Sequence, residues 1–200
     1  MKTVIHVILI AAICVVSYFI LESVMQPIRF NSEQKLRYEA TIERLKDIRT
    51  AQLAFRQEHR RYTGSFDTLI DFLKTGTFSM VRIVGDLDDS AAVASGRITR
   101  DTLFVSVMDS LFRKGFSVDS LRFVPFTTSG EEFELGINNI VAGNVVVNVF
   151  EAKVSNDVLL RGLDPQLLVN FNADRQQKTG YAGLKVGSLE ETTNNAGNWE

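Results

Sequence analysis

The chain has 200 residues, one cysteine and a formal net charge of −2, with 22 Lys and Arg against 24 Asp and Glu. Because nucleic acids are bound by clusters of excess basic side chains, this balance argues against a nucleic acid as partner. A single cysteine also excludes a disulfide within the chain, which fits either side of a membrane.

The first element is an apolar run from Thr3 to Leu21, whose polar interruptions are His6 and Ser17. As a helix it would be about 28 Å long, close to the thickness of the hydrocarbon core of a bilayer. We therefore expect residues 1–30 to form a membrane anchor and a short linker, with the lipid bilayer as the first partner.

A secretory signal peptide is the main alternative, because Lys2 supplies a positive start. The apolar run is longer than usual for such a peptide, and residues 21–25 lack the small residues of a cleavage site. Cys14 follows the bulky Ile13, so we interpret it as an apolar filler of the span and not as a lipidated cysteine.

The basic residues that follow the span, Arg29, Lys35 and Arg37, favour a cytoplasmic C-terminal region by the positive-inside rule. Long domains, however, cross membranes with little regard to charge. We expect an extracytoplasmic domain. The modest basic excess from Glu33 to Arg61 fits either a solvated helix face or contact with anionic lipid headgroups.

The second element is an amphipathic helix over residues 31–62, with Asn31 as N-cap and Gln34 as its capping-box partner. Pro27 lies between it and the anchor, which predicts either one kinked rod or a short bend. Charged residues separate the members of one apolar stripe, which predicts a helix with one buried face. The stripe comprises Leu36, Ile42, Leu45, Ile48, Ala51 and Phe55.

An α+β globular domain is predicted over residues 63–182, and a flexible polar tail over residues 183–200. Two helices have clear local signals: Phe66–Lys74, capped by Ser65 and stopped by Gly76, and a C-terminal helix that starts at Asp164-Pro165. β-Branched and aromatic residues predict antiparallel strands, the last two joined by a loop over 138–144. The strands are expected at 78–84, 103–108, 121–126, 133–137 and 145–150.

The end of the amphipathic helix, Ile48–Phe55 (IRTAQLAF), and the segment His59–Leu69 (HRRYTGSFDTL) resemble the same region of type IV pilins and type II secretion pseudopilins. The resemblance does not extend to the family's leader or to its glutamate near the start of the apolar helix, because Glu22 lies at the far end of the span. It implies a long helix packed on an antiparallel sheet, in a single-pass protein of the bacterial inner membrane with a periplasmic domain.

No catalytic, cofactor or metal signature is complete. His59 is the only histidine outside the span, and the acidic turn Asp86–Ser90 has Ala91 where a calcium loop needs glycine. We interpret it as an acidic turn, with a looser calcium site as the alternative. A carboxylate-based enzyme would need Glu131, Glu132 and Glu134, which solubilising charge explains equally well.

The leading hypothesis is therefore a non-enzymatic, pilin-like structural subunit or scaffold that contacts itself or other envelope or secretion proteins. We expect Ile42, Leu45, Ile48 and Phe55 to serve helix packing, and Trp199 to dock a partner. The alternative is a tethered extracytoplasmic domain that binds a small ligand or peptide.

Overall fold

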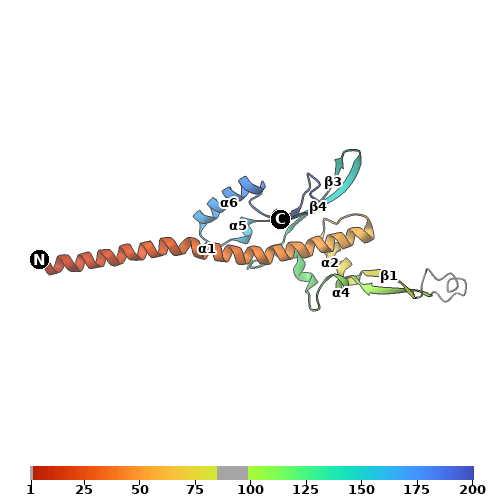
Figure 1. The fold of residues 1–200 in the computed structure, drawn as a ribbon, viewed down its shortest axis with the longest axis horizontal. Coiled ribbons are helices and arrows are strands. Elements are labelled where there is room, and N and C mark those ends of the chain that lie inside the picture. Colours follow the sequence, from red (N-terminus) through yellow and green to blue (C-terminus); the bar gives the residue numbers. More distant parts are fainter. Residues whose placement is uncertain (1, 85–98) are drawn as a thin grey trace.

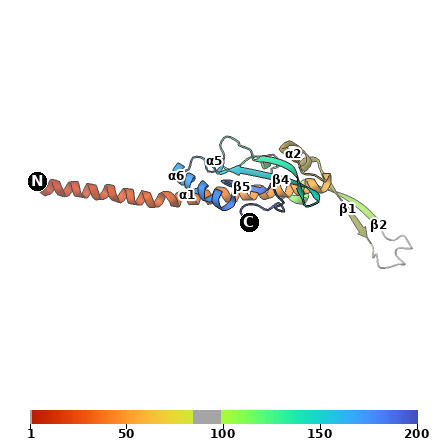
Figure 2. The same ribbon diagram turned by 90° about the horizontal axis from the view of Figure 1, so that it is seen from above.

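The computed structural model describes residues 2–84 and 99–200. The fold is α+β: one long N-terminal helix and two small antiparallel sheets, with short helices around them (Figures 1 and 2). The first half of the chain holds α1 (Lys2–His59), α2 (Phe66–Thr75), β1 (Thr77–Val84), β2 (Thr99–Ser106) and α4 (Val107–Leu111). The second half holds η1 (Val118–Arg122), β3 (Glu134–Ala142), β4 (Val145–Ser155), α5 (Asn156–Leu159), α6 (Pro165–Thr179) and β5 (Gly183–Gly187).

Helix α1 is continuous, with Pro27 inside it, so the anchor and the amphipathic helix are one element. The predicted helix start at Asn31 is therefore wrong. Pro27 removes only one backbone N–H, and the residues around it are largely exposed, so water can satisfy the carbonyl group that is freed. The C-terminal end of α1 at His59 agrees with the predicted end near residues 58–61.

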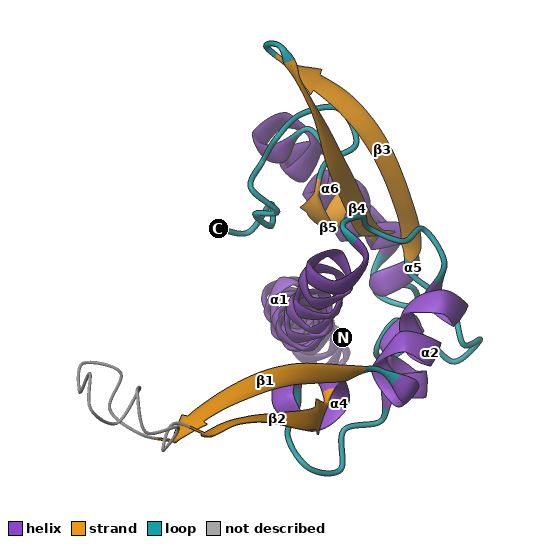
Figure 3. Ribbon diagram, turned by 90° about the vertical axis from the view of Figure 1, so that its right-hand side faces the viewer, coloured by secondary structure: helices purple, strands orange, loops and turns teal. Residues whose placement is uncertain are grey.

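The two sheets lie on opposite sides of α1, seen end-on in Figure 3. Strands β1 and β2 pair with each other, and the second sheet has the order β3-β4-β5. The core forms where the C-terminal half of α1 meets this second sheet and α2. Leu45, Ile48 and Leu69 lie there with Phe150 and Leu184, all fully buried. Helix α1 is thus the central element of the domain.

The two helices with clear local signals form where the sequence predicts them. Helix α2 begins after Ser65, whose side chain accepts a hydrogen bond from the backbone N–H of Thr68, and ends before Gly76. Helix α6 begins after Asp164, which accepts from the N–H of Leu167 at 2.9 Å, and has Pro165 at its first position. Both caps satisfy a backbone donor that the first turn leaves free.

The predicted strand over 121–126 is wrong, because η1 and an isolated bridge at Phe123 occupy this segment. The buried residues here are Val118, Leu121 and Val124, a spacing of three that matches a 3-10 turn and not the period of two of a strand. The strand expected at 103–108 ends at Ser106, because Val107 starts α4.

Strands β3 and β4 are longer than predicted and meet in a tight turn in place of the loop expected over 138–144. Ala142 pairs with Val145, which leaves only Gly143 and Asn144 in the turn. Gly143 has a φ of 64°, a conformation that glycine adopts without strain. The Gly-Asn pair between two apolar runs was the sequence signal for this turn.

The tail over 183–200 contains β5 and is packed, which corrects the predicted flexible tail. Leu184 and Val186 are fully buried, and Val186 forms an antiparallel bridge with Gly197. Asn194 and Asn195 both have positive φ, 53° and 60°, and reverse the chain so that the last residues run back along β5. Asparagine tolerates this conformation better than most residues, so its abundance here favours a turn.

Candidate membrane anchor and assembly surface

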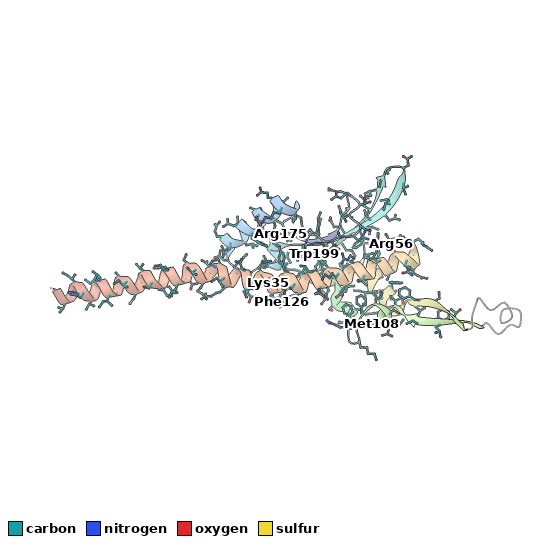
Figure 4. All side chains as sticks on the ribbon, in the orientation of Figure 1. Lys35, Arg56, Met108, Phe126, Arg175 and Trp199 are labelled. Carbon is teal, nitrogen blue, oxygen red and sulfur yellow. The ribbon has the colours of Figure 1, made fainter. Side chains whose placement is uncertain are left out.

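Within residues 2–84 and 99–200, α1 carries one segment long and apolar enough to cross a membrane. Every side chain from Thr3 to Leu21 is exposed, including Phe19 at 64%. In Figure 4 these side chains surround a rod that no other element approaches. An apolar surface of this extent is not stable in water, so the segment needs a bilayer or protein around it.

A short stretch of mixed polar and apolar residues separates this rod from the domain. Glu22 and Arg29 form an ion pair at 3.2 Å, and the Gln26 amide donates a hydrogen bond to the carboxylate of Asp164 just before α6. The first buried residue of α1 is Phe30, nine residues after Leu21 and hence about 14 Å along the helix. Gln26, five residues and hence about 8 Å beyond Leu21, already contacts the domain, so the edge of the domain lies at about the outer limit of the headgroup layer if Leu21 marks the edge of the hydrocarbon core.

The residues predicted to serve helix packing are placed inside this chain's own domain. Leu45 and Ile48 are fully buried, Phe55 is 3% exposed, and Ile42 is half-buried at the edge of the same core. The prediction is wrong for Leu36, which was assigned to the same buried face but is 51% exposed, because no other element in the described part of the chain covers this side of α1 there. The ring of Phe55 contacts that of Phe72 in α2, with centroids 5.2 Å apart. The contacts of Leu45, Ile48 and Phe55 are intramolecular, so these three side chains are not free to bind a second protein.

Trp199 also packs against its own chain and does not project as a docking residue (Figure 4). Its ring covers Gly197 so closely that an added Cβ would overlap with ring atoms. The neighbouring Glu200 forms an ion pair with Arg49 of α1 at 2.7 Å. The C-terminus is thereby fixed on α1, and Trp199 is held in place by the fold.

Polar contacts fix the two ends of the C-terminal half of α1, and the sequence interpretation missed them. At the membrane-proximal end, the Tyr38 hydroxyl donates a 2.5 Å hydrogen bond to the side-chain oxygen of Asn156, and Phe171 of α6 contacts the ring. Burial raises the pKa of Tyr38 to about 12, with Arg175 and Asn156 acting in the opposite direction. The position of Tyr38, seven residues before Leu45 and on the same face, was the available signal.

At the other end, Gln52 is fully buried and binds the backbone of Thr63 after the helix. Its amide nitrogen donates to the Thr63 carbonyl at 2.6 Å, and its oxygen accepts from the Thr63 N–H at 3.2 Å. This pair of bonds turns the chain back against α1. Gln52 lies one turn after Ile48, so its place on the buried face was visible in the sequence.

A hollow of about 260 Å³ lies between the end of α1, β4 and the tail. Arg56 and Tyr62 line it, and the Arg56 guanidinium donates to the Tyr62 hydroxyl at 2.7 Å. Asn195 donates to the same hydroxyl at 3.1 Å. The volume is slightly below the usual range for drug-sized ligands, and three of its polar side chains, Arg56, Tyr62 and Asn195, already bond one another.

The three carboxylates considered for an enzyme do not converge. Glu131 pairs with Arg161, Glu132 with Arg122 at 3.5 Å, and Glu134 with Lys153 at 3.8 Å. The described part of the chain holds no cluster of three metal-ligating side chains. The acidic turn Asp86–Ser90 lies outside the described residues.

Comparison of this chain with protein-family models, with curated protein sequences and with solved structures gives no significant match to any of them.

Proposed function

We propose that this protein is a single-pass membrane protein whose α1 helix anchors an extramembrane α+β domain, and that it is a pilin-like structural subunit or scaffold of a bacterial envelope assembly. In this proposal the domain lies in the periplasm. Its partners are other copies of the chain or other envelope or secretion proteins.

One observation carries the proposal: α1 is both the exposed apolar rod and the central helix of the domain. Because the helix continues from Thr3 through Phe30 into the core at Leu45 and Ile48, a force or displacement in the membrane segment is transmitted directly to the domain. A separate tether would need a loop or linker between the two, and residues 22–30 are helical here. A rigid connection of this kind suits a subunit that is stacked or scaffolded.

Membrane insertion is tested by placing charges in the middle of the rod. Ala12→Arg combined with Val16→Arg should shift the full-length protein from the membrane fraction to the soluble or degraded fraction, because each arginine near the centre disfavours insertion by about 2.5–3.5 kcal/mol. Together they offset the contribution of the twelve Val, Ile, Leu and Phe residues of the rod, about 4–7 kcal/mol on the same scale. Leu36→Arg, at an exposed position of the same helix beyond the rod, is the matched control and should leave the protein in the membrane. Equal fractionation of both variants would contradict the anchor.

The structural role is tested by crosslinking full-length protein in cells and purifying it in mild detergent. Ladders of the chain with itself, or with envelope or secretion proteins, are the expected result. Recovery of a monomer with no attached protein would favour the alternative, a tethered domain that binds a small ligand or peptide. The hollow beside Tyr62 and Asn195 is the place where that ligand would be sought.

A further inference from the structure

The apolar surface of α1 does not end at Leu21 on every side of the helix. Leu21, Val24, Met25 and Ile28 continue it for two more turns and fall within an arc of about 100° at 100° per residue. The last three are all exposed, Val24 at 56%, Met25 at 41% and Ile28 at 54%. We call these four residues the apolar stripe. The next residue on this side is the exposed Ser32, so the stripe ends at Ile28.

The opposite side of the same two turns is polar and faces the domain. Phe30, the first buried residue of α1, lies about 170° around the helix axis from the centre of the stripe. Glu22 and Arg29 lie between the two sides and form their ion pair at 3.2 Å. Gln26 donates a hydrogen bond to the carboxylate of Asp164. The domain is therefore attached to the side of α1 that lies away from the stripe.

The start of the rod shows the same asymmetry in the opposite sense. Thr3 and His6 lie within about 50° of the centre of the stripe, whereas Ile5 lies on the opposite side of the helix. Polar groups favour the headgroup layer over the hydrocarbon, so the depth of Thr3 and His6 follows from their polarity, whether or not their side chains bond within the chain. On the side of the stripe the apolar surface is thus displaced toward the domain at both of its ends.

A tilted helix produces this displacement. When a helix leans over, the side that faces down stays in the hydrocarbon longer at the upper surface of the bilayer and leaves it sooner at the lower surface. Residues 3–28 form about 39 Å of helix, against about 30 Å of hydrocarbon. A span longer than the hydrocarbon is thick is accommodated by tilting, within a range of about 0–40°.

The contact with Asp164 sets the direction of the tilt. It is made by Gln26, which lies at the level of the stripe but on the side of the domain. A lean toward the domain would press the Asp164 carboxylate and the start of α6 into the hydrocarbon, where a charge is strongly disfavoured. A lean toward the stripe lifts the same groups into water.

We propose that the apolar stripe lies among the lipid acyl chains, and that α1 crosses the bilayer tilted toward the stripe, with the domain on its upper side. The stripe is continuous with the rod, so the lipid that surrounds the one also covers the other. This inference rests on the proposed membrane insertion of the rod.

Spin labels on single cysteines measure the depth of each side of the helix. The full-length Cys14→Ala protein has no other cysteine and receives Ile28→Cys on the stripe, Ser23→Cys on the opposite side or Val16→Cys in the rod. Each labelled protein is reconstituted in vesicles of phosphatidylcholine and phosphatidylglycerol. Collisions of the label with oxygen, which concentrates in lipid, and with a water-soluble nickel chelate are then compared. An unchanged emission of the only tryptophan is the check that each domain remains folded.

An upright helix would place the label at Ile28 about 8 Å farther from the hydrocarbon than the label at Ser23. In the tilted helix the label at Ile28 should collide more often with oxygen than with nickel, and its nickel accessibility should be no higher than that at Ser23. A higher nickel accessibility at Ile28 than at Ser23 overturns the inference. Low accessibility to both reagents at Ile28 also overturns it, because protein then covers the stripe.

The label at Val16 separates this inference from the proposed function. Oxygen access without nickel access at Val16 leaves the anchor intact, whatever the labels at Ile28 and Ser23 report. Nickel access at Val16 overturns both the anchor and the tilt.

Discussion

The replacement of Gln52 by leucine is the sharpest test of how α1 is joined to the rest of the domain. Gln52 is fully buried, and its amide makes both hydrogen bonds available to the backbone of Thr63, at 2.6 and 3.2 Å. Leucine has a similar volume and fills the site, but it can form neither bond. The Thr63 N–H and carbonyl, in a residue that is 8% exposed, are then left without these partners.

The expected change in the free energy of unfolding follows from the two backbone groups of Thr63, its N–H and its carbonyl, that lose their partner. Each buried polar group left unsatisfied costs about 1–3 kcal/mol. The greater burial of an apolar side chain returns about 1–2 kcal/mol. We expect a net loss of about 3 kcal/mol, a substantial part of the 5–15 kcal/mol that stabilises a typical domain.

The assay is urea unfolding of the full-length protein in mild detergent, followed by the fluorescence of Trp199, the only tryptophan. Its ring packs on Gly197 and the core, so it reports the domain. Gln52→Leu should lower the midpoint by about 1.5 M urea for a slope of about 2 kcal/mol/M. Gln57→Leu, at an exposed position of α1, is the control and should change it little. A shift for Gln52→Leu no larger than the control's would refute the reasoning.

Three further predictions use the fluorescence of Trp199, the first and third in the same unfolding assay and the second in the native state. Leu45→Ala should lower the free energy of unfolding by about 2–5 kcal/mol, because the side chain is fully buried. Leu36→Ala should lower it by less than about 0.5 kcal/mol, because Leu36 is 51% exposed. Equal effects of the two substitutions would contradict the assigned core. Gly197→Ala should displace the Trp199 ring, which occupies the place of the added Cβ, and so shift the native emission spectrum; an unchanged spectrum would argue against this packing. Burial raises the pKa of Tyr38 from 10.0 to about 12, so the folded state disfavours ionisation of its hydroxyl. The free energy of unfolding is therefore unaffected by this group below pH 10 and declines as the pH rises toward 12. Tyr38→Phe should reduce that decline, and an unaltered pH profile would count against the burial of the hydroxyl.

Local signals in the sequence determined the helices well. The Ser65 and Asp164 caps and the proline after Asp164 each satisfy or remove a backbone donor of the first helical turn, so the residues that start α2 and α6 are readable without tertiary context. The apolar run from Thr3 to Leu21 is equally explicit, because length and hydrophobicity alone decide whether a helix can cross a bilayer.

The failures occurred where burial comes from distant segments. Leu121 was assigned to a strand because β-branched and aromatic residues follow it, but its burial follows the spacing of three that η1 presents to the core. The tail was predicted to be flexible from its polar composition. Its asparagines instead make specific bonds: Asn198 accepts from the Lys185 N–H at 3.1 Å and donates to the Gly183 carbonyl at 3.0 Å.

For the candidate membrane anchor and assembly surface, too, some features follow from the local sequence and others depend on distant segments. The sequence by itself determined that residues 3–21 form an apolar helix of membrane length and that Leu45, Ile48 and Phe55 share one buried face, since both follow from composition and helical period. Only the tertiary structure decided what covers that face: the chain's own sheet and α2, not a second protein. It also decided that Trp199 is packed against the chain. This packing depends on the turn at Asn194 and Asn195, which brings the backbone of Gly197 alongside β5.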